Sequence, residues 1–336
     1  MITPAEALES IAYLLEAELA PSYKVRAFRR AASVVRELAP QRLEALHRQG
    51  RLKQLAGVGD ATATVIAEAL SGARPAYLVT LEQRRPPAPQ GAAGALLARM
   101  RGDCHLHSDW SDGGSPIAEM AAAAVALGHE YAVLTDHSPR LTVAHGLSAE
   151  RLVHQREVLA ELAPRLAPFR LLSGIEVDIL DDGALDQDEG LLEALDLVVA
   201  SVHSKLTMER RAMTARLVSA VSNPHVDVLG HLTGRLVTGR GRPASDFDPE
   251  VVFAACAAAG TAVEINCRPE RQDPPDDLLA LAVATGCVFS IDTDAHAPGQ
   301  LEWQRLGCER AAAAGITAER VVNTWPLGEL LAWAAR

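Results

Sequence analysis

Histidine and carboxylate residues recur in this sequence at the ends of apolar runs. The densest group lies in residues 101–112, RGDCHLHSDWSD, which contains His105, His107 and Asp112. Residues two apart in an extended chain point to the same side, so His105 and His107 can aim at one point. Imidazole and carboxylate groups gathered at one point are typical ligands of a divalent transition metal. The sequence therefore predicts a metal site that begins in this segment.

Six further apolar runs end in the same residue types: YAVLTDHS, LLSGIEVD, LVVASVHS, VDVLGHLTG, TAVEINCR and CVFSIDTDAH. Seven apolar runs separated mostly by helix-like segments favour buried parallel strands joined by crossover helices. In barrels of this kind the chemistry gathers where the strands end. The residues that would meet there are Asp136, His137, Glu176, His203, His231, Glu264, Asp292, Asp294 and His296.

Composition describes a globular chain with room for one large domain and one small one. The 336 residues are 49% hydrophobic and 22% charged. No apolar run approaches the ~20 residues of a membrane helix, and the first residues lack signal-peptide features, so we expect a cytoplasmic protein without a membrane partner. Five cysteines without CxxC spacing argue against a disulfide framework.

Charge and composition divide the chain. Residues 1–90 carry 12 Lys and Arg against 9 Asp and Glu, or +3, which leaves 20 against 34, or −14, for residues 91–336. A mildly basic part is compatible with nucleic acid, and an acidic part is expected if it supplies carboxylates to cations. The Pro/Gly/Ala-rich stretch QRRPPAPQGAAG lies between them. We therefore expect a small domain at 1–82, a linker at 83–100 and a large domain at 101–336.

The small domain is predicted to be all α-helical. Apolar residues at helical spacing mark residues 4–19, 23–38, 42–48 and 61–70. Gly57-Val58-Gly59, between two helix-like segments, predicts a tight hairpin whose glycines let the backbone approach a ligand, and the N–H groups of the next helix are free to bind phosphate.

This hairpin resembles the helix-hairpin-helix DNA-binding motif, and the preceding KVRAFRRAASVVRELAP resembles the N-terminal domain of family X DNA polymerases. Members with lyase activity carry a Schiff-base lysine where this chain has Val65, and an alkyl group cannot replace an amine nucleophile, so lyase activity is not expected. The resemblance implies DNA as a partner. The candidate contacts are Lys24, Arg26, Arg29, Arg30, Gly57 and Gly59.

From residue 101 onward, the order HxH, DH, E, H, H and DxH resembles the PHP (polymerase and histidinol phosphatase) family, closest to the PHP module of bacterial family X polymerases. The polymerase palm and fingers are missing, so templated nucleotide addition is not expected. The resemblance implies an α/β fold, a distorted (β/α)7 barrel of the PHP type after the helix-hairpin-helix domain. It also implies two to three divalent metals. One metal would be held by His105, His107, Glu176 and Asp294. A second would be held by His203 and His231, with Glu176 bridging the two metals. A third would be held by Asp112, His137 and His296.

Ligands without thiolate suit Mn²⁺, Zn²⁺ or Fe²⁺. Clustered dications acidify water and stabilise the oxygens of a displacement at phosphorus, which favours phosphoester hydrolysis. Glu176 would act in catalysis as the bridge, and Lys205, Arg235 and Arg268 would hold phosphate oxygens. Asp136, Glu264 and Asp292 would orient imidazoles or loops. We expect Asp178, Asp181 and Asp182 to be solvated loop or cap residues.

Three functions are compatible with these residues. The first is a DNA phosphoesterase in DNA repair, acting at 3′ ends, 3′-phosphates or abasic lesions as a 3′-5′ exonuclease, 3′-phosphatase or AP endonuclease. The alternative is a small-molecule phosphatase acting on histidinol phosphate or nucleotides, which needs no helix-hairpin-helix. The third is a DNA-binding scaffold with a decayed site, and the complete ligand set argues against it.

Overall fold

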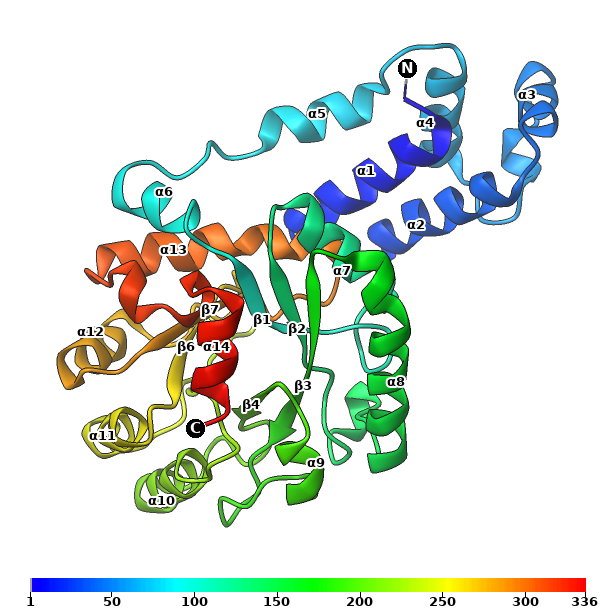
Figure 1. Cartoon of the computed structure of the whole chain (residues 1–336). Helices are drawn as coiled ribbons and strands as arrows, with labels where there is room; N and C mark the ends of the chain where they lie inside the picture. The colour runs from blue at the N-terminus through cyan, green and yellow to red at the C-terminus, as the bar shows by residue number, and fades with distance from the viewer. Residues whose placement is uncertain (1) are drawn as a thin grey trace. The chain divides into compact units, whose positions relative to one another are not determined.

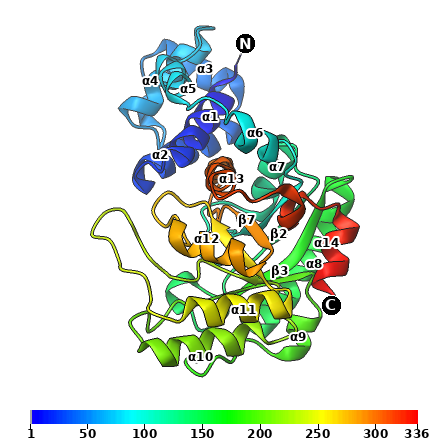
Figure 2. The ribbon, with the colours of Figure 1, turned by 90° about the vertical axis from the view of Figure 1, so that its left-hand side faces the viewer.

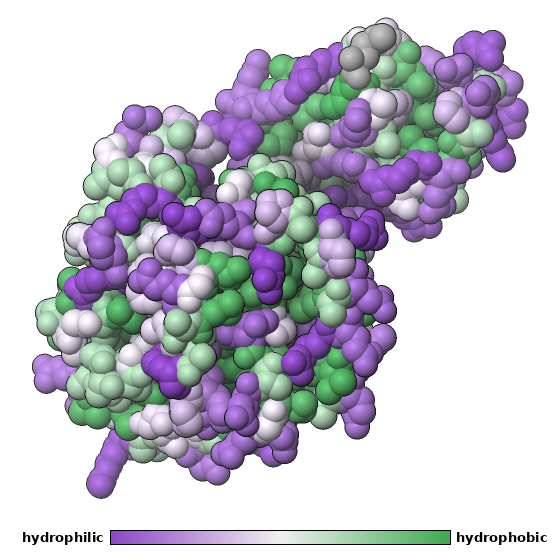
Figure 3. Space-filling model, viewed as in Figure 1, coloured by the Kyte–Doolittle hydropathy of each residue, from purple (hydrophilic) through white to green (hydrophobic). Residues whose placement is uncertain are grey.

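A computed structural model describes residues 2–336 of the chain. The chain divides into two compact units, Met1–Pro87 and Ala88–Arg336. Figure 1 shows the first as a group of helices and the second as strands surrounded by helices. No helix within residues 2–336 is long and apolar enough to cross a membrane. Hydrophilic side chains are spread over the visible face of both units (Figure 3).

The first unit is all α-helical, as expected. Its helices are α1 (Pro4–Ala17), α2 (Ser22–Glu37), α3 (Pro40–Arg48), α4 (Asp60–Leu70) and α5 (Ala76–Arg84). The first four match the predicted segments closely, whereas α5 was not anticipated. Helix α1 begins sharply because Thr3 and Glu6 form a reciprocal capping box and Pro4 occupies the first helical position. The fully buried side chains of Leu8, Ile11, Ile66 and Leu78 hold α1, α4 and α5 around one core.

The second unit is built on a sheet that, within residues 2–336, has seven parallel strands in chain order. They are β1 (Gly102–Leu106), β2 (Tyr131–Leu134), β3 (Arg170–Asp178), β4 (Leu197–Ser201), β5 (Val228–Leu229), β6 (Ala262–Asn266) and β7 (Phe289–Asp292). An isolated bridge between Leu106 and Ala295, with the His107 amide donating to the Ala295 carbonyl at 2.8 Å, nearly closes the sheet into a barrel. The predicted (β/α)7 barrel is confirmed.

Helices surround the strands (Figure 1). They are α6 (Gly91–Leu97), α7 (Ile117–Ala126), α8 (Ala149–Leu166), α9 (Glu189–Glu193), α10 (Arg210–Val221), α11 (Pro249–Ala259), α12 (Asp276–Thr285), α13 (Gln304–Ala313) and α14 (Leu327–Ala334). Short 3₁₀ turns occupy Leu52–Gln54, Thr142–Ala144, Pro298–Trp303, Ala318–Arg320 and Val322–Thr324.

Helix α6 lies inside the segment 83–100 that we expected to be a linker, and its Leu96 is buried. The second half of that segment is therefore ordered structure of the barrel unit.

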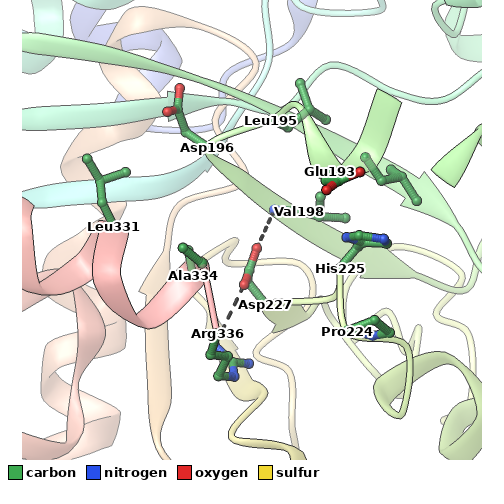
Figure 4. Close-up of a pocket in the computed structure, with 12 residues that line it drawn as sticks. Glu193, Leu195, Asp196, Val198, Pro224, His225, Asp227, Leu331, Ala334 and Arg336 are labelled. Atoms are coloured by element: carbon green, nitrogen blue, oxygen red, sulfur yellow. Dashed lines mark hydrogen bonds and ion pairs between the residues drawn. The ribbon is translucent and has the colours of Figure 1, made fainter. Parts of the chain in front are cut away.

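A pocket of about 460 Å³ lies at the N-terminal ends of β4 and β5, lined in part by Val198, His225, Asp227 and Arg336. Figure 4 shows the Asp227 carboxylate between the Val198 backbone and the Arg336 side chain. One Asp227 oxygen accepts a hydrogen bond from the Val198 amide at 2.8 Å, and the other lies 3.7 Å from Arg336. Burial raises the pKa of Asp227 to about 7, although both neighbours oppose the shift.

This raised pKa predicts a pH dependence of stability. Because the folded state holds the Asp227 proton more tightly than the unfolded chain does, this group stabilises the fold most below about pH 4, and the contribution is lost as the pH rises towards about 7. Asp227→Asn keeps an oxygen for the Val198 amide and cannot ionise. We expect the wild type to lose up to about 4 kcal/mol relative to Asp227→Asn between pH 4 and pH 8. Thermal unfolding of both proteins across this range measures the difference; parallel curves would contradict the assignment.

Candidate metal centre

The C-terminal ends of the strands bring the nine predicted ligand residues together. His105 lies on β1 and Glu176 on β3, and the others follow the strands within a few residues. These nine residues are His105, His107, Asp112, His137, Glu176, His203, His231, Asp294 and His296. Most of their side chains are almost completely buried, and that of Asp112, at 36% exposed, is the most accessible of the nine.

The Glu176 carboxylate lies at the centre of this group. One oxygen, Oε2, lies 3.4 Å from His105 Nε2, 3.5 Å from His107 Nε2 and 2.8 Å from His137 Nδ1. The other, Oε1, lies 3.2 Å from His203 Nε2 and 2.8 Å from His231 Nε2. The two oxygens therefore face two different sets of imidazoles, as expected of a carboxylate shared between two ions.

Three groups of side chains have ligand atoms within 4.8 Å of one another. The groups are His105, His107 and Asp294; His137, Glu176 and His203; and His107, Asp112, His137 and His296. They differ from the expected sets in three ways: His107 and His137 are shared between neighbouring groups, Glu176 is absent from the first group, and His231, which was expected in the second set, belongs to none of them. In the third group, Asp112 lies 3.4 Å from His137 Nε2 and 3.2 Å from His296 Nε2.

The chemistry of these atoms fits divalent cations. Two ligands that each lie about 2.1 Å from one ion are about 3.0 to 3.4 Å apart in octahedral or tetrahedral geometry. Most of the nitrogen–oxygen distances here are close to that range. Within the described residues, His105 Nε2, both ring nitrogens of His107 and His203, and Glu176 Oε2 are buried without a hydrogen-bond partner. Buried polar atoms left in this way are costly, and a cation would satisfy them.

Electrostatics favours the protonation states that ligands need at Glu176, His107 and His231, whereas the pKa values of His105, His137 and His203 are raised because Glu176 and the neighbouring carboxylates together outweigh the effect of burial. Burial alone would raise the pKa of Glu176, but the charges of His203, His105 and His137 hold it well below its usual value. Burial and the neighbouring imidazoles of His296 and His137 hold the pKa of His107 well below its usual value. Burial and the charge of Arg271 lower the pKa of His231 to about 4. Glu176 is thus a carboxylate at neutral pH, and His107 and His231 are neutral.

Two buried carboxylates fix the orientation of imidazoles. Glu264 lies 2.6 Å from His105 Nδ1 and accepts a hydrogen bond from the His231 amide, which agrees with the orienting role expected for it. Asp178 accepts from the His203 amide at 3.1 Å and lies 3.4 Å from His203 Nδ1. Asp178 is only 6% exposed, so the expectation that it is a solvated loop residue was wrong. The sequence could have predicted that Asp178 faces the site, because residues 176 and 178 of one strand point to the same face.

Asp136 and Asp292 hold the backbone rather than an imidazole. Asp136 accepts from the Ser108 and Ser111 side chains and from Gln155, which secures the segment between His107 and Asp112. Asp292 accepts from the Cys104 amide at 2.8 Å and from Asn323 at 2.7 Å. Both residues stabilise the start of the site by fixing β1 and the segment that follows it.

The basic residues predicted to hold phosphate lie in different surroundings. Arg268 donates to the Asp294 carbonyl at 3.0 Å, lies 2.9 Å from His296 Nδ1 and pairs with Glu270, so it borders the site. Arg235 donates to the backbone carbonyls of Arg271 and Gln272, and Lys205 forms an ion pair with Asp181 on an exposed loop. The positions of Arg235 and Lys205 therefore give no support to the role expected of them.

Arg271 is a site residue that the sequence interpretation missed. Its Nε lies 3.4 Å from Asp294 Oδ2 and is buried without a hydrogen-bond partner among the described residues. It lies in the same loop as Arg268, in the run CRPERQDPP. Nothing in that run distinguishes the arginine that faces the site from one that faces solvent, because the direction depends on the loop's tertiary contacts.

In the helical unit, the candidate DNA contacts also differ in their surroundings. Arg29 forms a bidentate ion pair with the buried Glu16, with both bonds at 2.9 Å, so it stabilises the packing of α2 on α1. This position gives no support to its expected role as a DNA contact. Lys24, Arg26 and Arg30 are exposed on α2.

The hairpin between α3 and α4 has the predicted backbone features. Gly57 has φ +93°, a conformation that favours glycine, and a Cβ there would touch the Arg30 side chain at 2.8 Å from Nε. Arg30 therefore lies directly against the hairpin. Gly59 precedes α4 in an ordinary extended conformation, φ −99° and ψ −173°, with open space where a Cβ would stand. Since glycine offers no side-chain cap, the first amides of α4 remain available to an anion.

Comparisons with known proteins match both units. Residues 3–74 match a family described as a helix-hairpin-helix domain, and residues 103–267 match the PHP domain. The DNA polymerase/3′-5′ exonuclease PolX of Bacillus subtilis is 38% identical over 240 residues, which are 71% of this chain and 42% of the relative. This chain thus spans less than half the length of that relative. A probable phosphatase of Thermoanaerobacter is 30% identical over 235 residues, 66% of this chain and 89% of the relative.

Among solved structures, a histidinol phosphate phosphatase from Lactococcus lactis, crystallised with zinc, L-histidinol and phosphate, superposes with a TM-score of 0.47. It is 19% identical and covers 65% of this chain and 95% of its own.

The ligand geometry predicts the metal content. We expect the purified protein to hold about three divalent ions, one for each of the three groups of ligand atoms. If two neighbouring groups share an ion, the total would be about two. His105→Ala combined with His107→Ala should remove at least one equivalent, as measured by elemental analysis. His225→Ala, in the pocket at the other end of the barrel, is the matched control and should keep the full content. Equal metal in the two variants would rule out the proposed ligands.

Glu176→Gln is expected to have a large effect on catalysis. The substitution removes one negative charge from between two groups of ligands while keeping the shape of the side chain. We expect kcat to fall at least about 100-fold, which is about 2.7 kcal/mol of transition-state stabilisation. Glu161→Gln makes the same chemical change at an exposed position on α8 and should leave kcat unchanged. Similar rates for the two variants would show that Glu176 is not shared between ions.

Proposed function

The chain belongs to the PHP family of metal-dependent phosphoesterases, and from this premise we propose that it hydrolyses phosphoester bonds at the 3′ ends or lesions of DNA in DNA repair. The reaction would be that of a 3′-5′ exonuclease, a 3′-phosphatase or an AP endonuclease. The helical unit would bind the DNA backbone, and the strand-end site of the barrel would perform the hydrolysis.

The arrangement at Gly57 is the observation that carries this proposal. Arg30 from α2 packs against Gly57, so a guanidinium lies beside a hairpin whose following helix presents free amides. A guanidinium and helix N-terminal amides together recognise a phosphate group. A phosphatase for small metabolites has no use for such a surface in a separate unit. The Bacillus subtilis relative, whose name includes a 3′-5′ exonuclease, lends further support.

Within the barrel, the residues proposed as ligands are the six histidines and three carboxylates gathered around Glu176. Bound divalent ions would lower the pKa of coordinated water and stabilise negative charge on the phosphate oxygens. Glu264 and Asp178 would fix the imidazoles of His105 and His203 in direction. Arg268 and Arg271 would add positive charge beside Asp294 and orient the phosphate group.

A small-molecule phosphatase is the second candidate. Its support is the Thermoanaerobacter relative, which is named a probable phosphatase and is matched over 89% of its length. The substrate would be a phosphate monoester such as histidinol phosphate or a nucleotide. A Mn²⁺-supplemented panel of 3′-labelled DNA, 3′-phosphate DNA, histidinol phosphate and nucleoside monophosphates separates the two functions.

Gly59→Val tests the role of the hairpin in the full chain. Because the backbone at Gly59 is ordinary and a Cβ there meets nothing within 4 Å, we expect the variant to fold normally while its side chain fills the space in front of α4. Turnover of DNA at low concentration, kcat/KM, should fall about tenfold, since binding energy from a remote site acts only on substrates that reach it.

A minimal phosphoester such as p-nitrophenyl phosphate is the control substrate for this variant, and its turnover should not change. DNA turnover equal to that of the wild type would reject the hairpin as the DNA site. Turnover of metabolites alone, with DNA untouched by the wild type, would favour the small-molecule phosphatase.

A further inference from the structure

The loop that follows β5 contains a narrow arm, residues 234–242, with the sequence GRLVTGRGR. Leu236 and Arg242 exchange two backbone hydrogen bonds at 2.9 Å, so the two sides of the arm are paired like a short hairpin. Residues 238–241 form its exposed tip. Figure 2 shows this segment in yellow-green as a narrow loop that extends away from the strands.

The base of the arm is fastened to the loop that carries Arg268 and Arg271. The Val237 amide donates to the Glu270 carbonyl at 2.7 Å, and the Arg235 guanidinium donates to the carbonyls of Arg271 and Gln272. Arg271 in turn lies 3.4 Å from Asp294, one of the proposed ion ligands. A continuous chain of contacts therefore connects the arm to the candidate metal centre.

The tip presents one free cation. Arg240 is exposed, and among residues 2–336 no hydrogen-bond or ion-pair partner of its guanidinium is found. It stands between Gly239 and Gly241, whose φ angles of +65° and +67° suit glycine. The Gly241 amide donates to the Thr238 carbonyl at 3.0 Å, so the tip is a tight turn directly beyond the pair formed by Leu236 and Arg242. A tight glycine turn that carries an unpaired arginine is suited to meeting an anion outside the barrel.

The arm itself is positively charged although the barrel unit is acidic. Residues 234–242 contain three arginines, Arg235, Arg240 and Arg242, and no Asp or Glu. The arginines of the loop beneath it already face carboxylates, since Arg268 pairs with Glu270 at 2.9 Å and Arg271 lies 3.4 Å from Asp294. At physiological salt, charges more than about 8 Å away are largely screened, so this local excess decides which ligands approach.

We infer that the arm is a second nucleic-acid contact, in which Arg240 binds a backbone phosphate of the single-stranded DNA that leads away from the bond being hydrolysed. This inference rests on the proposed function and adds a substrate requirement: a strand longer than the nucleotide at the metal centre. A phosphate monoester of a metabolite ends at the centre and cannot reach the tip. The arm thus distinguishes polymeric from small substrates within the barrel unit itself.

The test uses the full chain with Mn²⁺ and three substrates: an oligothymidylate of about twelve nucleotides, within the usual site sizes of single-strand binders, a dinucleotide, and p-nitrophenyl phosphate. For Arg240→Gln we expect kcat/KM on the long strand to fall about tenfold, with little change on the other two. The slope of log kcat/KM against log salt on the long strand should flatten by about 0.7, which corresponds to one phosphate contact.

Two matched variants complete the design. Arg240→Lys keeps the charge and should keep the salt slope. Arg165→Gln removes an exposed arginine near the end of α8, at the opposite end of the barrel, and should behave as the wild type. If the wild type hydrolyses the long strand and Arg240→Gln does so equally well with the same slope, the arm inference is overturned while the proposed function stands. If the wild type hydrolyses only the small phosphoester, both are overturned.

Discussion

The buried charge of Glu176 is the constraint on which the rest of the barrel site depends. A carboxylate removed from water loses several kcal/mol of solvation unless nearby charges replace it. Five imidazoles face this carboxylate, His105, His107 and His137 around one oxygen and His203 and His231 around the other, and the charges of His203, His105 and His137 lower its pKa. Neutral imidazoles do not supply that charge, and burial favours neutrality for His107 and His231. Divalent cations held by these side chains would supply positive charge while leaving the imidazoles neutral, and so would meet both requirements at once.

Such a site needs rigid side chains, and buried carboxylates farther from the centre provide the rigidity. Glu264 binds both the His105 ring and the His231 backbone, and therefore couples β1 to the end of β5. Asp103 accepts from the His105 amide at 3.0 Å and from the Thr293 side chain at 2.6 Å, which couples β1 to the end of β7. These bonds cross between strands far apart in the sequence. Loss of one of these hydrogen bonds would therefore displace proposed ligands on two strands. The parallel sheet keeps the distances between the strands constant.

Much of this arrangement was predictable because parallel strands impose a simple rule. Residues at strand ends must meet, so the pattern of apolar run followed by His or carboxylate located the site without knowledge of any distance. Sequence spacing does not reveal the partners of individual side chains. Arg29 looked free because its partner Glu16 lies on another helix. Arg235 looked like a phosphate ligand because it follows β5, but its guanidinium turns to the carbonyls of Arg271 and Gln272. Asp178 was misjudged for a different reason, since strand alternation from Glu176 already placed it on the inner face.

The acidic net charge of the barrel unit is a poor guide to its partners. Many of its carboxylates are buried and face histidines or backbone amides, so they contribute little to the field that an approaching strand meets. Glu176, Glu264 and Asp292 are each at most 1% exposed. The arm arginines Arg235, Arg240 and Arg242, by contrast, are partly or fully exposed. Screening limits each charge to its own neighbourhood. An acidic unit can therefore hold cations with its interior and contact phosphates with its rim, because the two functions use charges that do not compete for the same space.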